Sequence, residues 1–307
     1  MAIASFISSS TDHSLVLTKK KKRRMPEICI TMDDVNYLRG QLYSGAERDS
    51  LMRAALKIRQ VKAGMFFIGK YLESEEGKKI MRAWDQEGHL ILNHTYSHPH
   101  YNDETISYEA FSKDVLRCDA LLKECKNFKR IFRFPYLEEG NTKEKRNAMR
   151  AFLQKQNYKS GYVSVMTTDW WINAKMEEAL EADAETDKSK YKNLYLSQVK
   201  ECAAFYKTLA EKVEGRPVKH VILLHHNLLN ALYLGDLIDM LRLEGWKVIS
   251  AEEAFNDPVY SQYPDFYPST SSLFTTLSSA RNIQGAGGAV LPENQVYDKE
   301  YLKKFGL

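Results

Sequence analysis

The chain has 307 residues, of which 44% are hydrophobic and 11% aromatic, so it can bury the core of one large α/β domain or of two small ones. Six basic residues at 19–24 produce its formal charge of +4, and the rest of the chain carries about −2. A near-neutral body offers no basic surface for nucleic acid, and no apolar stretch approaches the roughly 20 residues of a membrane span.

Residues 1–24 show no periodic hydrophobic pattern. Residues 1–17 are mildly apolar and the basic run follows them, which reverses the order found in a secretory signal peptide. We therefore expect a disordered basic leader, with a nuclear or anionic-surface address as the alternative. The chain has four cysteines, which are Cys29, Cys118, Cys125 and Cys202. They form no C-x-x-C pair, so we expect reduced packing residues and favour a cytoplasmic location.

From residue 26, short apolar runs alternate with stretches of helical periodicity. The predicted strands are 27–32, 64–68, 89–93, 130–134, 161–166, 219–225 and 246–250. The predicted helices are 45–60, 73–87, 104–125, 143–157, 191–213 and 230–244. This alternation predicts a parallel sheet in an α/β fold, closed into a complete or distorted (β/α) barrel of about seven strands. We expect one domain over residues 25–256 and an irregular tail over 257–307, with a short helix near 297–305.

Polar side chains stand directly at the ends of several predicted strands. They are Asp33 and Asp34 after the first strand, His94 after the third, Arg133 at the end of the fourth, Asp169 after the fifth and His225 at the end of the sixth. In parallel barrels, the loops after the strands build the active site. The sequence therefore predicts that these side chains belong to one site.

The spacing of His94 and His98 predicts a metal site. On a helical turn, residues four apart lie on one face, so both imidazoles would reach a single metal ion. One carboxylate of Asp33 and Asp34 can supply a third ligand, and the other would then lie where a general base is useful. H-x-x-x-H is common in polar loops, so this prediction depends on the acidic pair at the end of a buried strand.

Five segments together point to a family. They are TMDD at 31–34, HTYSHP at 94–99, RFPY at 133–136, DW at 169–170 and LLH at 223–225. In type, order and spacing they resemble the motifs of the polysaccharide deacetylase (NodB homology) family of carbohydrate esterases, over about residues 26–255. The resemblance implies a distorted (β/α) barrel and a metal-dependent hydrolase. Such an enzyme removes acetyl groups from N-acetylglucosamine units of chitin, peptidoglycan or related glycans, or from O-acetylated sugars.

The resemblance also implies a role for each motif residue. The implied metal ligands are Asp34, His94 and His98, and Zn²⁺ suits this set, with Co²⁺ or Ni²⁺ as alternatives. The implied catalytic residues are Asp33 as general base, His225 as general acid, and Arg133 with Asp169 as the residues that tune the base. The implied substrate-binding residues are Tyr136, through its backbone N–H, and Trp170 and Leu223, which hold the acetyl methyl group.

Three positions depart from the family pattern. They are Val35 in place of a glycine, Met166 in place of an acid three residues before the Asp-Trp pair, and His226 where Asp is frequent. Without the acid at position 166, we expect Arg133 to pair with Asp169 beside Asp33. The departures leave the implied ligands, base and acid in place. His226 and a further histidine, His100, are assigned no role.

Two other functions are compatible with the motifs. A non-catalytic carbohydrate-binding relative would keep the fold, but a pure binder needs neither Asp33 nor His225. A C–N hydrolase acting on a small non-polymeric amide would need the same residues, because the motifs describe the attacked carbonyl and not the rest of the substrate. The sequence does not identify the sugar, the polymer length or the oligomeric state.

Overall fold

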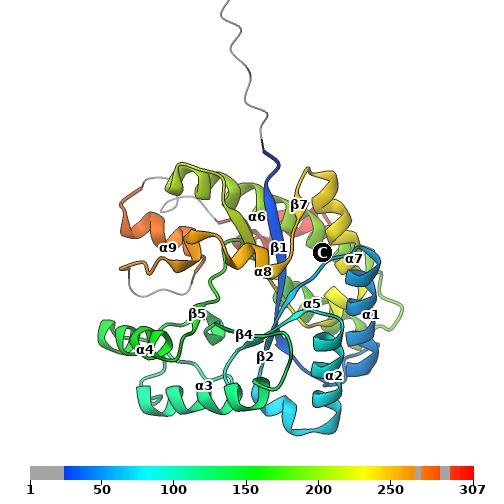
Figure 1. The fold of residues 1–307 in the computed structure, drawn as a ribbon. Helices are drawn as coiled ribbons and strands as arrows, with labels where there is room; N and C mark the ends of the chain where they lie inside the picture. Colours follow the sequence, from blue (N-terminus) through cyan, green and yellow to red (C-terminus); the bar gives the residue numbers. More distant parts are fainter. Residues whose placement is uncertain (1–23, 267–270, 284–290) are drawn as a thin grey trace, which may run out of the picture.

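The computed structural model describes residues 24–266, 271–283 and 291–307 (Figure 1). The predicted basic leader lies outside these residues, apart from Arg24 at its end. Across the described ranges, no helix combines the length and the apolar composition needed to span a bilayer. The four cysteines are free thiols, and Cys125 is the one whose side chain is only partly buried.

One curved, parallel sheet forms the centre of the fold. Its strands are β1 (Glu27–Val35), β2 (Gly64–Phe67), β3 (Leu90–Asn93), β4 (Phe128–Phe132), β5 (Lys159–Ser160), β6 (Lys219–His225) and β7 (Lys247–Val248). The order is β5-β4-β3-β2-β1-β6, and β7 pairs with the beginning of β1. The predicted α/β fold with a distorted barrel of parallel strands is therefore confirmed.

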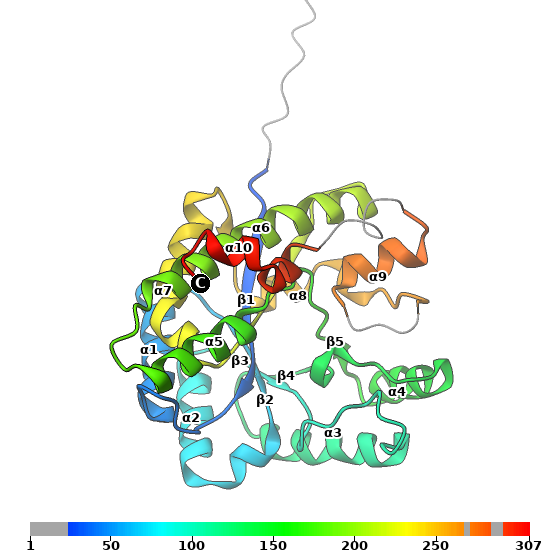
Figure 2. The same ribbon diagram turned by 180° about the vertical axis from the view of Figure 1, so that it is seen from behind.

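The sheet is wrapped by helices on its outer side (Figures 1 and 2). The helices are α1 (Gly45–Ile58), α2 (Glu75–Gln86), α3 (Tyr108–Leu122), α4 (Lys143–Lys155), α5 (Asp169–Ala182), α6 (Ser189–Glu214), α7 (Leu228–Leu243), α8 (Ala251–Phe255), α9 (Leu273–Ala280) and α10 (Lys299–Lys303). Short 3₁₀ turns are η1 (Gly69–Glu73), η2 (Pro135–Leu137), η3 (Pro258–Ser261) and η4 (Pro292–Tyr297). Many of the α-helices begin at a residue whose side chain caps the first turn. At α1, for example, Ser44 and Glu47 form a capping box.

The strand predicted at 161–166 is misplaced. β5 ends at Ser160, and the chain then passes from the β5 edge of the sheet to the β6 edge, where Val165 forms a bridge with Ile222. The carbonyl oxygen of Val165 accepts the N–H of Leu223 at 3.1 Å. This bridge nearly closes the barrel, and it places the residues that directly follow Val165, as far as Asp169, beside β6.

Three α-helices appear where none was predicted, and they are α5, the short α8 and α9. Helix α5 buries Ile172, Met176 and Leu180, which are spaced four residues apart as a helix face requires. Helix α9 lies within the tail that was expected to be irregular, and its N-cap Ser272 accepts the N–H of Thr275 at 3.1 Å. The tail expectation is therefore wrong over α9, while α10 lies inside the short terminal helix expected near 297–305.

Candidate metal and catalytic site

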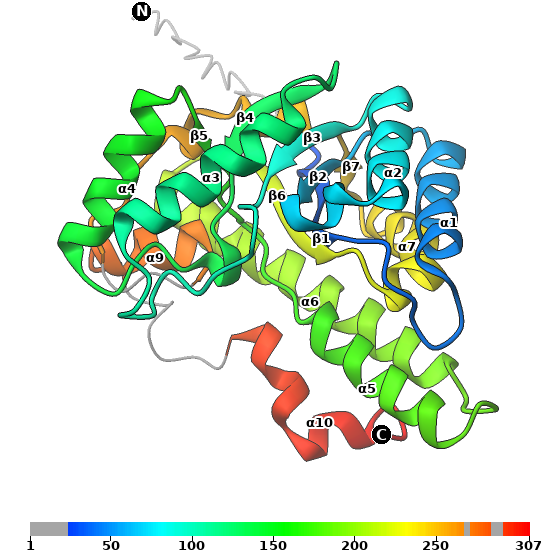
Figure 3. The ribbon, with the colours of Figure 1, turned by 90° about the horizontal axis from the view of Figure 1, so that it is seen from below.

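The predicted site residues meet at the end of the sheet where the strands finish, which is the end seen in Figure 3. Asp33 and Asp34 lie near the end of β1, where its pairing with β2 is irregular between Met32 and Val35. Successive strand side chains normally point to opposite faces, but Asp34 has a φ of 62°, which turns its carboxylate back toward the side of Asp33. The left-handed residue is Asp34, so the β-branched Val35 that replaces the usual glycine needs no unusual conformation.

The loop after β3 carries His94 and His98, and it is not the helical turn that the spacing suggested. Thr95 and His98 have positive φ values of 67° and 62°, which fold the loop tightly. Asn93 Oδ1 accepts the N–H of Thr95 at 2.9 Å, and Thr95 Oγ1 accepts the N–H of His98 at 3.0 Å. Asp114 Oδ2 accepts two further loop N–H groups at 2.9 Å. These side chains, which the sequence analysis did not single out, fix the loop in its conformation.

Asp34, His94 and His98 bring three possible ligand atoms within 4.8 Å of one another. Asp34 Oδ1 lies 3.1 Å from His98 Nε2 and 3.5 Å from His94 Nε2. His94 Nδ1 lies 2.8 Å from the carbonyl oxygen of Arg133, so it donates its proton there and leaves Nε2 as the free lone pair facing Asp34. These three residues could hold a metal ion, and the outer hydrogen bond of His94 is already made.

The protonation states of these groups suit metal binding. Burial lowers the pKa of His94, which favours the neutral imidazole that a ligand must be. Burial acts to raise the pKa of Asp34, but the imidazoles of His98 and His94 outweigh it and the pKa falls below its usual value. Among the described residues, buried Asp34 Oδ1 has no hydrogen-bond donor, although His98 Nε2 is near. A divalent cation bound at this oxygen atom would give it the partner that it lacks.

Asp33 is held by Arg133. Arg133 Nη1 lies 2.5 Å from Asp33 Oδ1 and donates to Thr31 Oγ1 at 3.0 Å, while Nε donates to the carbonyl oxygen of Gly161 at 2.7 Å. The ring of Phe66 lies under the guanidinium, with its centroid 3.9 Å from Cζ. Only 1% of Arg133 is exposed, so the guanidinium is fixed. Asp33 Oδ2 is left facing the ligands, 3.6 Å from His94 Nε2.

The predicted ion pair between Arg133 and Asp169 is wrong. Asp169 pairs with His225: Oδ1 lies 2.8 Å from His225 Nδ1, and Oδ2 accepts the His225 backbone N–H at 2.8 Å. The bridge at Val165 is the reason, because it carries Asp169 to β6, away from β4 and Arg133. Asn230 Nδ2 also donates a hydrogen bond to Asp169 Oδ2 at 2.8 Å. The sequence analysis did not single out Asn230 as a residue that holds Asp169.

The pairing with Asp169 makes His225 a stronger base than an ordinary histidine. Burial acts to lower the pKa of this imidazole, but Asp169 outweighs burial and raises the pKa to about 9. His225 is therefore protonated at neutral pH. The neighbouring His226 lies elsewhere: its Nε2 is 3.3 Å from Asp49 Oδ1, in the interior of the protein. A proton donor at the site is thus His225 and not His226.

A cavity of about 390 Å³ unites the site. Its lining residues are Asp33, Asp34, His94, His98, Tyr136, Leu137, Met166, Thr167, Trp170, Leu223 and His225. Tyr136 and Trp170 are exposed by 48% and 49%, so two aromatic rings stand at its rim. Arg133 and Asp169 lie behind this lining, where they hold Asp33 and His225. Met166 lines the cavity at the position where the family usually has an acid.

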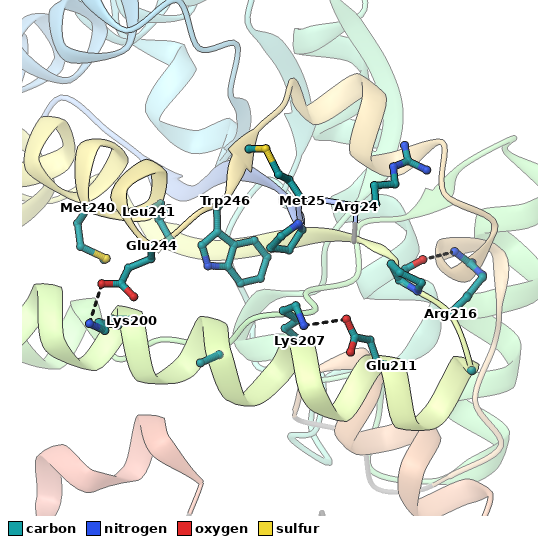
Figure 4. Close-up of a pocket in the computed structure, with 14 residues that line it drawn as sticks. Arg24, Met25, Lys200, Lys207, Glu211, Arg216, Met240, Leu241, Glu244 and Trp246 are labelled. Atoms are coloured by element: carbon teal, nitrogen blue, oxygen red, sulfur yellow. Dashed lines mark hydrogen bonds and ion pairs between the residues drawn. The ribbon is translucent and has the colours of Figure 1, made fainter. Parts of the chain in front are cut away.

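A larger cavity of about 610 Å³ lies at the opposite end of the barrel (Figure 4). Trp246 faces it, and two ion pairs lie on its walls, Lys200 with Glu244 at 2.6 Å between two helices and Lys207 with Glu211 at 2.8 Å within α6. Its lysines are thus neutralised by carboxylates. It holds none of the residues of the strand-end motifs, so we place the chemistry in the smaller cavity.

A parallel α/β barrel with a possible His-His-Asp metal centre, flanked by a carboxylate and a protonated histidine, defines a class of barrel hydrolases. Residues 20–155 match the model of the polysaccharide deacetylase family. This match covers a little under half of the chain, and it supports the predicted relationship to the NodB-type carbohydrate esterases over that stretch. Such a relationship indicates a hydrolase acting on amide bonds.

Individual relatives are distant. A peptidoglycan-N-acetylglucosamine deacetylase of Bacillus cereus is 29% identical over 116 residues, which is 38% of this chain and 38% of that protein. Among solved structures, a CE4 family pseudoenzyme from Bacillus anthracis is 18% identical with a TM-score of 0.53, over 76% of this chain and 66% of that one. A peptidoglycan N-acetylglucosamine deacetylase is 20% identical with a TM-score of 0.51, over 74% and 87%. These structural likenesses concern the fold.

Proposed function

We propose that this protein is a metal-dependent deacetylase that removes acetyl groups from an N-acetylglucosamine-type polysaccharide. One observation supports the proposal most: the ligand atoms of Asp34, His94 and His98 lie within 4.8 Å of one another on a cavity that also holds Asp33 and His225. A binding module would need the metal cluster at most, whereas a hydrolase needs a base and an acid beside it. The name of the Bacillus cereus relative supports an N-acetylated glycan as the substrate class.

The cluster suits a transition metal of the zinc type. One carboxylate and two neutral imidazoles form a ligand set that Zn²⁺ prefers, and Co²⁺ or Ni²⁺ can occupy it as well. Asp34, His94 and His98 would hold the ion. A divalent cation bound there polarises an amide carbonyl and lowers the pKa of a water molecule.

The residues of the chain supply the proton transfers. Asp33, whose Oδ1 is held by Arg133, would accept the proton of the attacking water at Oδ2. The Tyr136 N–H would donate a hydrogen bond to the carbonyl oxygen as that oxygen gains negative charge. His225 would donate its proton to the leaving nitrogen as the C–N bond breaks. Trp170 and Leu223 line the part of the cavity where we place the acetyl methyl group.

Acetate release tests the proposal. Chelator-treated protein and the same protein reloaded with Zn²⁺ are incubated with N-acetylglucosamine oligosaccharides, peptidoglycan, O-acetylated glycans and small amides. We expect acetate from the N-acetylated glycans, with the reloaded protein only, and none from a reloaded Asp33→Asn control. A reloaded protein that binds one equivalent of metal but releases no acetate from any glycan would contradict the proposal.

The same panel separates the two alternatives. Some structural neighbours are pseudoenzymes, so a non-catalytic relative is a concrete possibility. It would bind the oligosaccharides without releasing acetate, with or without metal. A hydrolase of small non-polymeric amides would leave the glycans intact and cleave only the small amides.

A further inference from the structure

His100 stacks on the ring of Tyr136 at the rim of the cavity. The two ring centroids are 3.6 Å apart and the ring planes differ by 9°. The same tyrosine ring meets His98 at a steeper angle, with centroids 4.6 Å apart. Tyr136 therefore contacts a metal-ligand candidate and a histidine that the proposed reaction does not use.

The backbone at Tyr136 depends on its neighbours for support. Tyr136 and Leu137 both have positive φ values, 56° and 58°, in a region that side chains other than glycine rarely occupy. Such residues keep that conformation only where the surrounding structure holds them. The N–H of Leu137 donates a hydrogen bond to the carbonyl oxygen of Phe134 at 3.0 Å, and the N–H of Glu138 donates one to that of Pro135 at 3.0 Å. These two bonds stabilise the turn from within.

Contacts around His100 also hold this turn from outside. His100 Nδ1 lies 3.4 Å from Glu138 Oε1, and Glu138 Oε2 accepts the N–H of Asn102 at 3.2 Å. Asn102 Oδ1 accepts the N–H of Gly140 at 2.9 Å. The segment after His98 is thus joined to the segment after Tyr136 by one ring stack and by polar contacts. A substitution of His100 should therefore affect the turn at Tyr136 and Leu137 before any other part of the site.

We infer that His100 is a positioning residue: its ring holds Tyr136 in the left-handed conformation that aims the Tyr136 N–H at the acetyl carbonyl oxygen. The inference rests on the proposed function, because the carbonyl belongs to the proposed substrate. The His100 side chain is 55% exposed, so its ring contributes to the loop and not to the core. Removal of an aligned N–H donor typically costs about 10²–10³ in turnover. If the turn at Tyr136 is less rigid, its N–H is aligned for part of the time only, and turnover should fall by part of this factor.

Substitution of His100 tests the inference on Zn²⁺-loaded protein with N-acetylchitopentaose as the probe. We expect His100→Ala to lower kcat about tenfold and to leave KM within about twofold, because a donor engaged mainly in the transition state affects kcat. His100→Phe keeps a flat ring in the stack and should restore most of kcat. Tyr108→Ala removes an aromatic partner of Phe152, 6.2 Å away on helices α3 and α4, and serves as the matched control without effect.

A double-mutant cycle decides whether His100 acts through Tyr136. If it does, His100→Ala should cost little further activity in a Tyr136→Ala protein. The same loss in both backgrounds would overturn the inference, because it would mean that His100 contacts the substrate itself. An unchanged kcat in His100→Ala would overturn it as well.

A second measurement does not depend on activity. In protein labelled with ¹⁵N-tyrosine, the Tyr136 amide is assigned by its absence in Tyr136→Phe, and its heteronuclear NOE reports fast backbone motion. We expect this value to fall in His100→Ala and to recover in His100→Phe. A wild type that releases no acetate rejects the proposed function alone, and the amide then decides the positioning role. An amide equally rigid in His100→Ala overturns that role.

Discussion

Replacement of Asp169 by asparagine should remove the main cause of the raised pKa of His225. Asp169 is fully buried, and its Oδ1 lies 2.8 Å from His225 Nδ1. Without that negative charge, burial still lowers the pKa of His225, and the largest interaction that raises it is gone. The pKa should then fall from about 9 to 6.5 or below. The side chain keeps nearly the same volume, so the change is mainly electrostatic.

The expected loss follows from the protonated fraction of His225. At pH 8, a fall in pKa from about 9 to 6.5 lowers that fraction from about 0.9 to about 0.03, roughly thirtyfold. If His225 is the general acid, kcat/KM at pH 8 should fall by at least this factor, and the alkaline limb of the pH profile should move from near pH 9 to pH 6.5 or below. At pH 6 the loss should be much smaller.

The raised pKa also affects the stability of the metal-free protein. A folded pKa of about 9 against an unfolded value of 6.5 corresponds to about 3 kcal/mol, for an imidazole that is 19% exposed. This contribution is fully present below pH 6.5, declines as the pH rises, and is lost above about pH 9. The gap in stability between wild type and Asp169→Asn should therefore be widest near pH 6.

Two measurements check this prediction. The pKa of His225 is followed by NMR of its ring proton in both proteins, and kcat/KM is measured from pH 5 to 10 on N-acetylchitopentaose. Asp257→Asn is the control, because Asp257 is also a buried acid in an ion pair, with Arg216 at 2.6 Å, at the other end of the barrel. An Asp169→Asn protein that keeps an alkaline limb near pH 9 would refute the assignment of His225 as the acid that Asp169 holds.

Three further predictions concern the metal, the base and acid, and the leader. Asp34→Asn and His98→Ala should each lower the Zn²⁺ content, measured by mass spectrometry after dialysis, whereas Asp33→Asn should retain it; loss of metal in Asp33→Asn would exchange the roles of the two acids. Asp33→Asn and His225→Ala should each lower turnover by about 10²–10⁴, and full activity in either would remove that residue from the mechanism. A chain that starts at Met25 should keep the melting temperature and the activity, and a loss of several degrees would show that the leader packs on the barrel.

Local sequence patterns predicted the elements that carry their own signal. β1 and β6 are apolar runs of the length of a strand, and both were predicted within a few residues of their bounds. The acids and histidines at strand ends were found in the same way, because parallel strands all finish at one end of the sheet. Such patterns need no knowledge of which strand pairs with which.

Features set by distant pairing escaped prediction. Residues 161–166 were predicted as one strand because they are apolar, but Val165 pairs with Ile222 across the barrel. That crossing decides that Asp169 meets His225, so the error in the strand led to the error in the Arg133 ion pair. The loop between His94 and His98 likewise depends on Asp114 of helix α3, which no local spacing reveals.

The pairing of β1 with β6 also determines when this protein can fold. Every residue of β1 from Glu27 to Asp33 lies opposite a residue of β6, from Lys219 to His225. A ribosome that adds about 5–20 residues per second needs roughly ten to forty seconds to go from the first strand to its partner. During that time a strand that is almost entirely buried in the folded protein has an unpaired edge, which is a template for aggregation. A fragment limited to residues 20–155 would keep that open edge permanently, so we expect it to require a chaperone or to precipitate.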